Sequence, residues 1–225
     1  MSGVAAIVPA YNEGDRVGRV LRAALAASLV TEVIAVSDGS SDGTARRASE
    51  VAGVTVIDLK RNVGKGGAMA AGVRATKASV VVFIDADLEG LGPEHVDAIV
   101  KPVVEGRADV CVGIFRDGKT WSDAAQRVSP FLSGQRAMRR EVFEAVPYPD
   151  ELRFGIEVAL NTAARKRRAR IVRVLLRGVS NAHKEQKMGM VKGTAARLRM
   201  YGEITQAMVK NRKRKRASSK RSRWL

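Results

Sequence analysis

The first half of the chain alternates between short apolar runs and segments with apolar residues at helical spacing. Nearly continuous apolar runs, as expected for strands covered on both faces, predict β-strands at Val4–Val8, Val33–Ser37, Val54–Asp58, Val80–Ile84 and Val110–Phe115. The segments between them predict helices, through an apolar stripe at Val17, Leu21, Ala24 and Leu25 and over Thr44–Ala52, Lys65–Thr76 and Pro93–Val104. Strands that alternate with helices are typical of an α/β fold with a mostly parallel sheet.

The pattern becomes less regular after Trp121. A loop-rich stretch is expected up to Asp150, followed by a helix near Gly155–Arg168 and a strand near Arg170–Leu176. With 225 residues, the chain has the size of one compact domain. We therefore expect one mostly parallel, Rossmann-like sheet flanked by helices, with a mixed, less regular C-terminal half.

The composition excludes several classes of protein. Apolar residues make up 45% and charged residues 28%, which is ordinary for a globular protein that buries a core. The longest charge-free stretches, residues 23–31 and 78–84, fall short of the ~20 residues that a membrane-spanning helix needs. No secretory signal is recognisable, and the single Cys111 suits a small apolar strand position. We expect a cytoplasmic location.

The net charge of +17 is the abnormal value in the composition. Nine Lys or Arg and no acid lie from Lys210 to Arg223, so residues 1–209 carry 17 − 9 = +8. Basic charge in the tail, residues 210–225, together with Trp224 suits peripheral contact with an anionic membrane at its inner face. A solvated tail is the alternative. A nucleic-acid-binding arm is disfavoured because aromatic residues are only 4% and no stacking motif is visible.

Polar loops follow the first two predicted strands. In a parallel sheet, ligands bind beyond the carboxyl ends of the strands, which directs attention to Pro9-Ala10-Tyr11-Asn12-Glu13 and to the loop from Ser37 to Thr44. Asp38 is placed to accept hydrogen bonds from a nucleobase or a ribose hydroxyl. Asp42 and Thr44 are interpreted instead as a turn that caps the next helix.

The next two connections carry a lysine and two aspartates. In Asn62-Val63-Gly64-Lys65-Gly66-Gly67, a glycine-rich turn opens a helix, where free N–H groups and the lysine favour an anion or a base edge. The spacing of a Walker loop is missing, which excludes that ATPase signature. Asp85 and Asp87 follow the fourth strand, and two converging carboxylates favour a hard cation such as Mg²⁺ or Mn²⁺.

These four loops resemble those of the family 2 glycosyltransferases with the GT-A fold, in the same order and spacing. The motifs are IVPAYNE, VSDGSSDGT, NVGKGGAM and DADLEG. The resemblance implies a UDP- or GDP-linked sugar donor and a divalent metal on its diphosphate, held by Asp85 and Asp87. It assigns the nucleotide sugar to Pro9, Tyr11, Glu13, Asp38, Lys65, Asp85 and Ala86. Many relatives have two adjacent aspartates where this chain has Ser37-Asp38, so the base preference stays open.

The second half resembles two branches of that family, the polyprenyl-phosphate sugar transferases and the glucosyl-3-phosphoglycerate synthases. The matching segments are LSGQRA from Leu132, RREVF from Arg139 and FGIEV from Phe154. The resemblance places Gly134 and Gln135 near the sugar and acceptor, and Glu157 at the reaction centre. It also offers His183 as a further metal ligand, with Asn181 as the alternative. Arginines expected to bind an acceptor phosphate are Arg116, Arg127, Arg136 and Arg140.

The resemblance divides residues 1–209 into a nucleotide-sugar-binding half, residues 1–115, and an acceptor half, residues 116–209. We expect metal-dependent transfer of a sugar to a phosphorylated acceptor, polyprenyl phosphate first and a small soluble phosphate compound as the alternative. Asp87 and Glu157 are the catalytic candidates, with Asp150 and Glu151 as other acids placed late enough to act as a base. His95 is interpreted as a solvated surface residue. A nucleotidyltransferase is disfavoured because a basic, glycine-rich loop is missing after the first strand.

Overall fold

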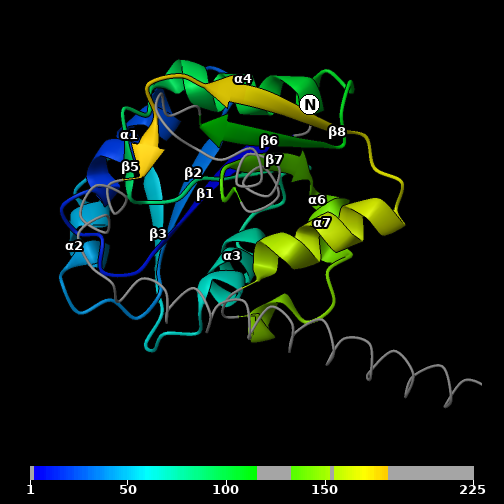
Figure 1. Ribbon diagram of the computed structural model, residues 1–225. Coiled ribbons are helices and arrows are strands. Elements are labelled where there is room, and N and C mark those ends of the chain that lie inside the picture. Colours follow the sequence, from blue (N-terminus) through cyan, green and yellow to red (C-terminus); the bar gives the residue numbers. More distant parts are fainter. Residues whose placement is uncertain (1–2, 116–132, 153–154, 182–225) are drawn as a thin grey trace, which may run out of the picture.

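A computed structural model describes residues 3–115, 133–152 and 155–181. Predictions that concern Arg116, Arg127, His183 and the tail at 210–225 lie outside the described residues. One seven-stranded sheet runs through the described part in the order β3-β2-β1-β4-β7-β6-β8 (Figure 1). Its strands are β1 (Val4–Ala10), β2 (Glu32–Ser37), β3 (Val54–Asp58), β4 (Val80–Phe83), β6 (Val110–Phe115), β7 (Arg136–Arg139) and β8 (Ile171–Leu176). A second, two-stranded sheet pairs β5 (Leu88–Glu89) with β9 (Ser180–Asn181).

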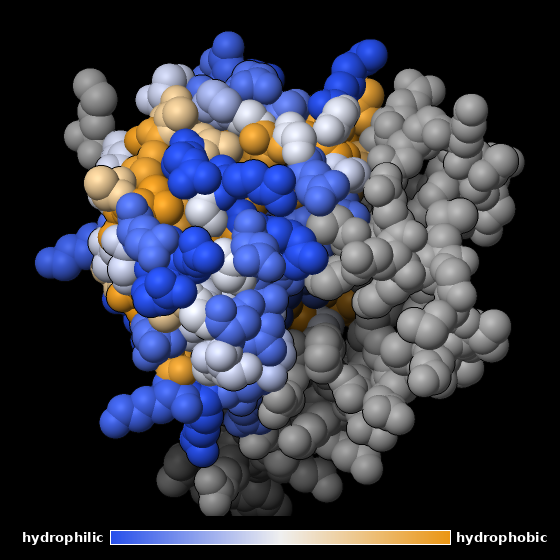
Figure 2. All heavy atoms as spheres, turned by 90° about the vertical axis from the view of Figure 1, so that its left-hand side faces the viewer, coloured by the Kyte–Doolittle hydropathy of each residue, from blue (hydrophilic) through white to orange (hydrophobic). Residues whose placement is uncertain are grey.

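Helices cover both faces of the large sheet, as its apolar strands require. One face packs on α1 (Val17–Ala26), α2 (Thr44–Ser49) and α4 (Pro93–Val104). The other packs on α3 (Lys65–Arg74), α6 (Arg140–Glu144) and α7 (Ile156–Lys166). Alternate residues of β1 enter the two cores: Ala6 and Val8 belong to the first, Ala5 and Ile7 to the second. On the side of α1 and α2, hydrophilic side chains predominate at the surface (Figure 2).

The predicted α/β architecture is confirmed, with strands β1 to β4 and β6 within two residues of the predicted ends. The expectation of a loop-rich stretch up to Asp150 is wrong for its described part. Residues 136–139 form β7, which pairs antiparallel with both β4 and β6, and α6 follows directly. Cys111 is a buried residue of β6, as predicted, and burial raises the pKa of its thiol to about 12.

The antiparallel direction of β7 decides where its preceding residues lie. Arg136, the first residue of β7, pairs with Phe83 near the carboxyl end of β4 and with Val112 of β6. The segment just before β7 is therefore delivered to the edge where the parallel strands end. Gly113 donates its N–H to the Gln135 carbonyl at 2.8 Å, which fixes this segment to β6. One inserted strand thus brings residues 133–135 to the same edge as the aspartates after β4.

Gly66, in the first turn of α3, leaves no room for a side chain. Its N–H donates to the Leu152 carbonyl at 2.9 Å, and a Cβ would overlap the carbonyl oxygens of Leu152 and Pro149. We expect Gly66→Ala to lower the free energy of unfolding by about 1–3 kcal/mol through overpacking, measured by urea titration. Gly18→Ala in α1 is the control, because a Cβ there meets only the flexible Arg22 side chain. A Gly66→Ala variant as stable as the Gly18→Ala variant contradicts this packing.

Candidate active site

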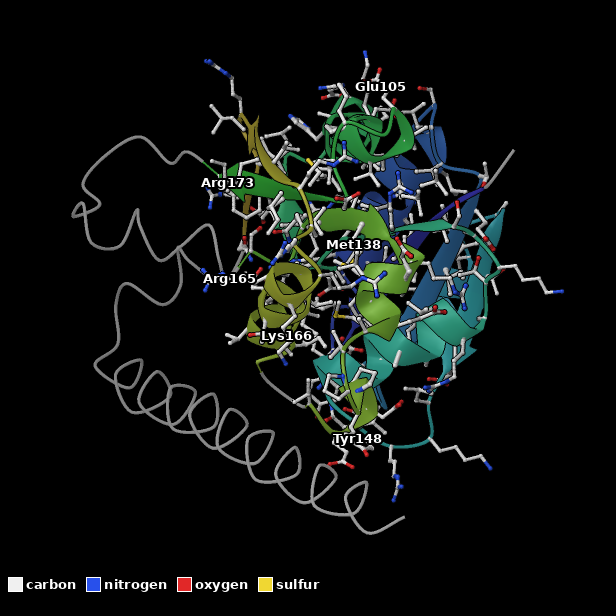
Figure 3. All side chains as sticks on the ribbon, turned by 90° about the vertical axis from the view of Figure 1, so that its right-hand side faces the viewer. Glu105, Met138, Tyr148, Arg165, Lys166 and Arg173 are labelled. Carbon is white, nitrogen blue, oxygen red and sulfur yellow. The ribbon has the colours of Figure 1, made fainter. Side chains whose placement is uncertain are left out.

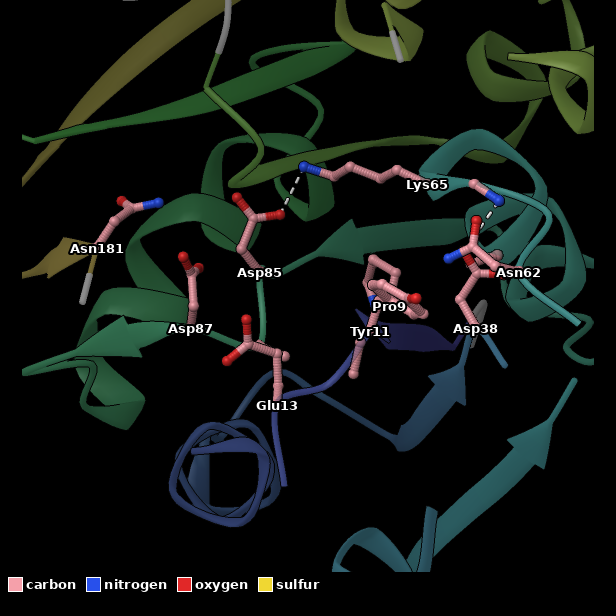
Figure 4. Close-up of a pocket in the computed structure, with 13 residues that line it drawn as sticks. Pro9, Tyr11, Glu13, Asp38, Asn62, Lys65, Asp85, Asp87 and Asn181 are labelled. Carbon is pink, nitrogen blue, oxygen red and sulfur yellow. Dashed lines mark hydrogen bonds and ion pairs between the residues drawn. The ribbon is translucent and has the colours of Figure 1, made fainter. Parts of the chain in front are cut away.

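A pocket of about 570 Å³ opens beyond the carboxyl ends of β1, β2 and β4 (Figure 4). This volume is in the range of small-molecule sites. All eight residues predicted for the nucleotide sugar and metal in the first half line it: Pro9, Tyr11, Glu13, Asp38, Lys65, Asp85, Ala86 and Asp87. Ala10, Asn62, Gly64, Ala68 and Asn181 complete the lining. The strand-end rule thus locates the pocket, although the role of each residue toward a ligand stays a prediction.

Asp38 is more deeply built into the protein than expected for a ligand-binding residue. It is 3% exposed, and its two carboxylate oxygens accept the N–H groups of Val63 at 2.7 Å and Gly64 at 2.9 Å. The N–H of Gly66 is also taken, by Leu152. The expectation that these N–H groups are free for an anion is therefore wrong. Asp38 shapes the turn before α3, and only the remaining lone pairs of its oxygens are left for a nucleobase or ribose.

Lys65 lies between two carboxylates at the centre of the site. Its Nζ is 2.6 Å from Asp85 Oδ1 and 2.8 Å from Glu157 Oε1. Burial alone lowers the pKa of a lysine, but the two carboxylates outweigh it and raise the pKa of Lys65. In turn, burial raises the pKa of Asp85, and the charge of Lys65 overcomes that effect, so the pKa lies below its usual value. Lys65, expected at the nucleoside, therefore joins Asp85 to Glu157.

Gln135 holds the other oxygen of Asp85. This side chain is 1% exposed, and its Nε2 donates to Asp85 Oδ2 at 2.8 Å. Gly134 lies against the same carboxylate, where a Cβ would overlap the side chains of Asp85 and Lys65. Both residues were expected near the sugar and acceptor. In the structure they fix the orientation of Asp85, and contact with sugar or acceptor stays a prediction.

The structure corrects the expected roles of two arginines. Arg136 is 1% exposed; its guanidinium donates to the Ser133 carbonyl, and its Nη1 lies 3.2 Å from Asn161 Oδ1. Burial lowers its pKa, and the charges of Glu157 and Asp85 oppose that effect. It therefore supplies positive charge from beneath the site and does not offer its guanidinium to an acceptor. Arg140 donates to the carbonyls of Val73 and Thr76 at the end of α3.

Asp87 and Asn181 lie at the other corner of the pocket. The pairing of Leu88 with Asn181 between β5 and β9 brings Asn181 close to Asp87, while Glu13 approaches from the loop after β1 (Figure 4). Within the described part of the chain, His, Cys, Asp and Glu side chains form no group of three or more with metal-binding geometry. The assignment of Asp85 and Asp87 as metal ligands stays a prediction, and His183 lies beyond the described residues.

Other polar residues that the sequence singled out have structural partners. Asp42 accepts from the N–H of Thr44 at 3.0 Å and of Gly14 at 2.9 Å, which confirms its interpretation as a turn residue. The expected helix cap is wrong, because Gly43 precedes α2 and no described side chain caps the helix. The prediction that His95 is a solvated surface residue is wrong, because its side chain is largely buried. Its Nδ1 accepts the N–H of Gly92 at 2.9 Å, so its Nε2–H donates to the Arg177 carbonyl at 3.1 Å. Asp150, a candidate base, pairs with Arg74 at 2.8 Å.

A mostly parallel sheet with this pocket and its paired aspartates defines the class of protein as a GT-A-like glycosyltransferase. The chain belongs to glycosyl transferase family 2, whose family model matches residues 5–151. The match covers nearly all of the first half and continues to residue 151 of the second.

Two relatives and one solved structure, all similar to this chain, represent the two branches already named. An undecaprenyl-phosphate 4-deoxy-4-formamido-L-arabinose transferase of Edwardsiella ictaluri is 29% identical over 84% of this chain and 64% of the relative. That of Klebsiella pneumoniae is 30% identical over 72% of this chain and 57% of the relative. Glucosyl-3-phosphoglycerate synthase of Mycobacterium tuberculosis, crystallised with Mn²⁺, UDP and glucosyl-3-phosphoglycerate, superimposes with a TM-score of 0.67 at 27% identity, covering 80% of this chain and 72% of that one. The chain thus spans about three fifths of the length of the curated relatives it matches.

Proposed function

We propose that this chain moves a sugar from a UDP- or GDP-linked donor to a phosphorylated acceptor, with polyprenyl phosphate at the cytoplasmic face of a membrane as the first candidate. The observation that carries the proposal is that Asp38, Lys65, Asp85 and Asp87 line one pocket beyond the strand ends. The similarity to transferases that are named for undecaprenyl phosphate supports the acceptor. Among residues 3–115, 133–152 and 155–181, no helix is long and apolar enough to cross a bilayer.

The donor atoms at the Asp85–Asp87 corner fit Mg²⁺ or Mn²⁺. Carboxylate oxygens are the ligand type that hard cations prefer, and the side-chain amide of Asn181 lines the same pocket. We propose Asp85 and Asp87 as ligands and His183 as the third. When bound, such a cation stabilises the charge that develops on the departing diphosphate, an effect worth several kcal/mol. The neighbours solved with Mn²⁺ or with Mg²⁺, each with UDP, support this assignment.

The other charged and polar side chains of the site hold the carboxylates of Asp85 and Glu157 in position. Lys65 bridges Asp85 and Glu157 and offsets the repulsion between the two carboxylates, and Gln135 fixes the orientation of Asp85. A phosphate acceptor brings its own negative charge, so attack on the sugar needs no strong general base. Glu157, paired with the Lys65 ammonium, is proposed to position the acceptor beside the donor sugar. Tyr11, 51% exposed at the pocket rim, offers a ring for a nucleobase.

The second candidate is transfer to a small soluble phosphorylated acceptor. It is favoured by the similarity to glucosyl-3-phosphoglycerate synthase, which covers both halves of the described fold. The product distinguishes the two candidates. Incubation with a panel of nucleotide sugars and either polyprenyl phosphate or phosphoglycerate, followed by mass spectrometry, is expected to give a glycosylated lipid phosphate. A glycosylated phosphoglycerate instead selects the second candidate.

Thermal unfolding tests the donor and metal directly. A UDP- or GDP-sugar at about 100 times its Kd, with Mn²⁺ present, is expected to raise the Tm by roughly 5–10 °C, because a ligand bound only to the native state adds about 2.7 kcal/mol. Chelation of the metal is expected to remove most of this increase. A Tm that no nucleotide sugar changes, with or without Mn²⁺, contradicts the proposed function.

A further inference from the structure

A dense cluster of exposed cations lies outside the active site. Residues 158–181 contain seven Lys or Arg and no Asp or Glu. Six of the seven form what we call the basic face, which comprises the end of α7, the connection to β8 and the beginning of β8. These residues are Arg165, Lys166, Arg167, Arg168, Arg170 and Arg173. All six are exposed, and Figure 3 shows Arg165, Lys166 and Arg173 on the side of the molecule formed by α7 and β8.

Local structure explains why these cations gather on one surface. Arg165 and Lys166 lie in the last turn of α7, and Arg173 lies on β8, the last strand in the order of the large sheet. The other three cations lie in the short connection between these two elements. Along β8, Val172 and Val174 pack on the core, so Ile171 and Arg173 point to the opposite side. Glu141 pairs with Arg167 at 3.1 Å and Asp109 with Arg170 at 3.2 Å, but both arginines remain about half exposed. Ile171, 41% exposed, adds an aliphatic side chain within the basic face.

We propose that the basic face binds the anionic headgroups of a lipid bilayer. Each cation near such a surface contributes about 1 kcal/mol before screening, so six provide reversible binding without a membrane-spanning helix. Residues 155–181 contain no Phe, Tyr or Trp, and the stacking platform of single-stranded nucleic-acid sites is therefore missing from this surface. The exposed Ile171 is instead of the kind that enters the headgroup region.

The remainder of the chain does not complement this face. Residues 182–225 contain 14 Lys or Arg and two Glu, a net charge of +12. Like charges repel, so this segment is a poor occupant for the basic face and a suitable second contact with the same anionic surface. The proposal extends the membrane contact expected of the tail to the folded domain. The role of this membrane contact rests on the proposed function, because the contact would bring the active site to a lipid-phosphate acceptor in the bilayer.

The experiment uses the full chain and two kinds of vesicle, one of phosphatidylcholine alone and one with about 30% of the anionic lipid phosphatidylglycerol. The test variant is Lys166→Glu/Arg168→Glu/Arg173→Glu. The matched control, Arg22→Glu/Arg46→Glu/Lys101→Glu, makes the same change in net charge with exposed residues of α1, α2 and α4, on the opposite layer. We expect the test variant to lower the partition coefficient on anionic vesicles about tenfold or more, and the control to change it about twofold or less.

Three results overturn the proposal: equal losses in the two variants, no preference of the unmodified chain for anionic vesicles, or loss of DNA-duplex binding with unchanged vesicle binding. The nucleotide-sugar thermal shift, measured on the same samples, separates this proposal from the proposed function. Vesicle binding that depends on the basic face supports the proposal whether or not that shift is seen. Far-UV circular dichroism verifies that both variants are folded.

Discussion

Replacing Asp85 with asparagine is expected to lower the rate of sugar transfer by about two or more powers of ten, because a metal ligand is lost and a bound cation supplies several kcal/mol. The amide is also a poor substitute within the site. Asp85 accepts from Lys65 on one oxygen and from Gln135 on the other, so one of them would face the new NH₂ group, donor against donor. Steady-state kcat/KM with Mn²⁺ measures the loss.

Asp97→Asn is the control for the Asp85 variant. Asp97 of α4 accepts the N–H groups of Ser28 and Leu29 and does not line the pocket. Its replacement is expected to affect stability and to leave kcat/KM within about twofold. If the Asp85→Asn enzyme transfers sugar at a rate close to that of the Asp97→Asn enzyme, the assignment of Asp85 as a metal ligand is wrong.

Replacing Lys65 with methionine is expected to lower the free energy of unfolding by about 1–3 kcal/mol at neutral pH. The side chain is 28% exposed, which places the effect below that of a fully buried ion pair. Without the ammonium, Asp85 and Glu157 retain their burial and their mutual repulsion. Lys65→Arg keeps the charge and serves as the control. Urea titration of the two variants, with and without Mn²⁺, gives the comparison, and Mn²⁺ is expected to stabilise the methionine variant more than the unmodified protein.

The Lys65 effect depends on pH in a defined direction. In the unmodified protein, the lowered pKa of Asp85 adds stability above the unfolded-state value of about 3.9, and this stability is lost as the pH falls through that range. In the methionine variant, burial without the neighbouring cation raises the pKa of Asp85, so protonation of Asp85 relieves the repulsion. The difference in stability is therefore expected to be largest near neutral pH and to narrow toward pH ~4. A difference that widens on acidification contradicts the pairing.

The sequence was sufficient for the first four strands and for the loops that follow them, because both signals are local. Apolar runs mark strands buried on two faces, and the rule for parallel sheets then brings Asp38, Lys65, Asp85 and Asp87 to one edge. The pocket containing them was predictable without knowledge of any distance.

Contacts between residues distant in sequence were not predictable. Strand β7 is short, and arginine occupies both of its ends, so its pattern does not indicate a strand at the centre of a sheet. The bond between Gln135 and Asp85 joins residues 50 apart, and the burial of Arg136 follows from β7 lying between β4 and β6. For Asp38, the sequence indicated a polar group at the right place and gave no sign that Val63 and Gly64 already occupy it.

The inserted strand β7 also gives the protein a point of variation. Gly113 near the end of β6 and Gln135 just before β7 are hydrogen-bonded, so the excursion of the chain between β6 and β7 begins and ends at nearly the same place. Doubling the length of such an excursion costs only about 0.6 kcal/mol of closure entropy. The connection between β6 and β7 can therefore change in length or sequence during evolution while the strands that hold the pocket stay unchanged.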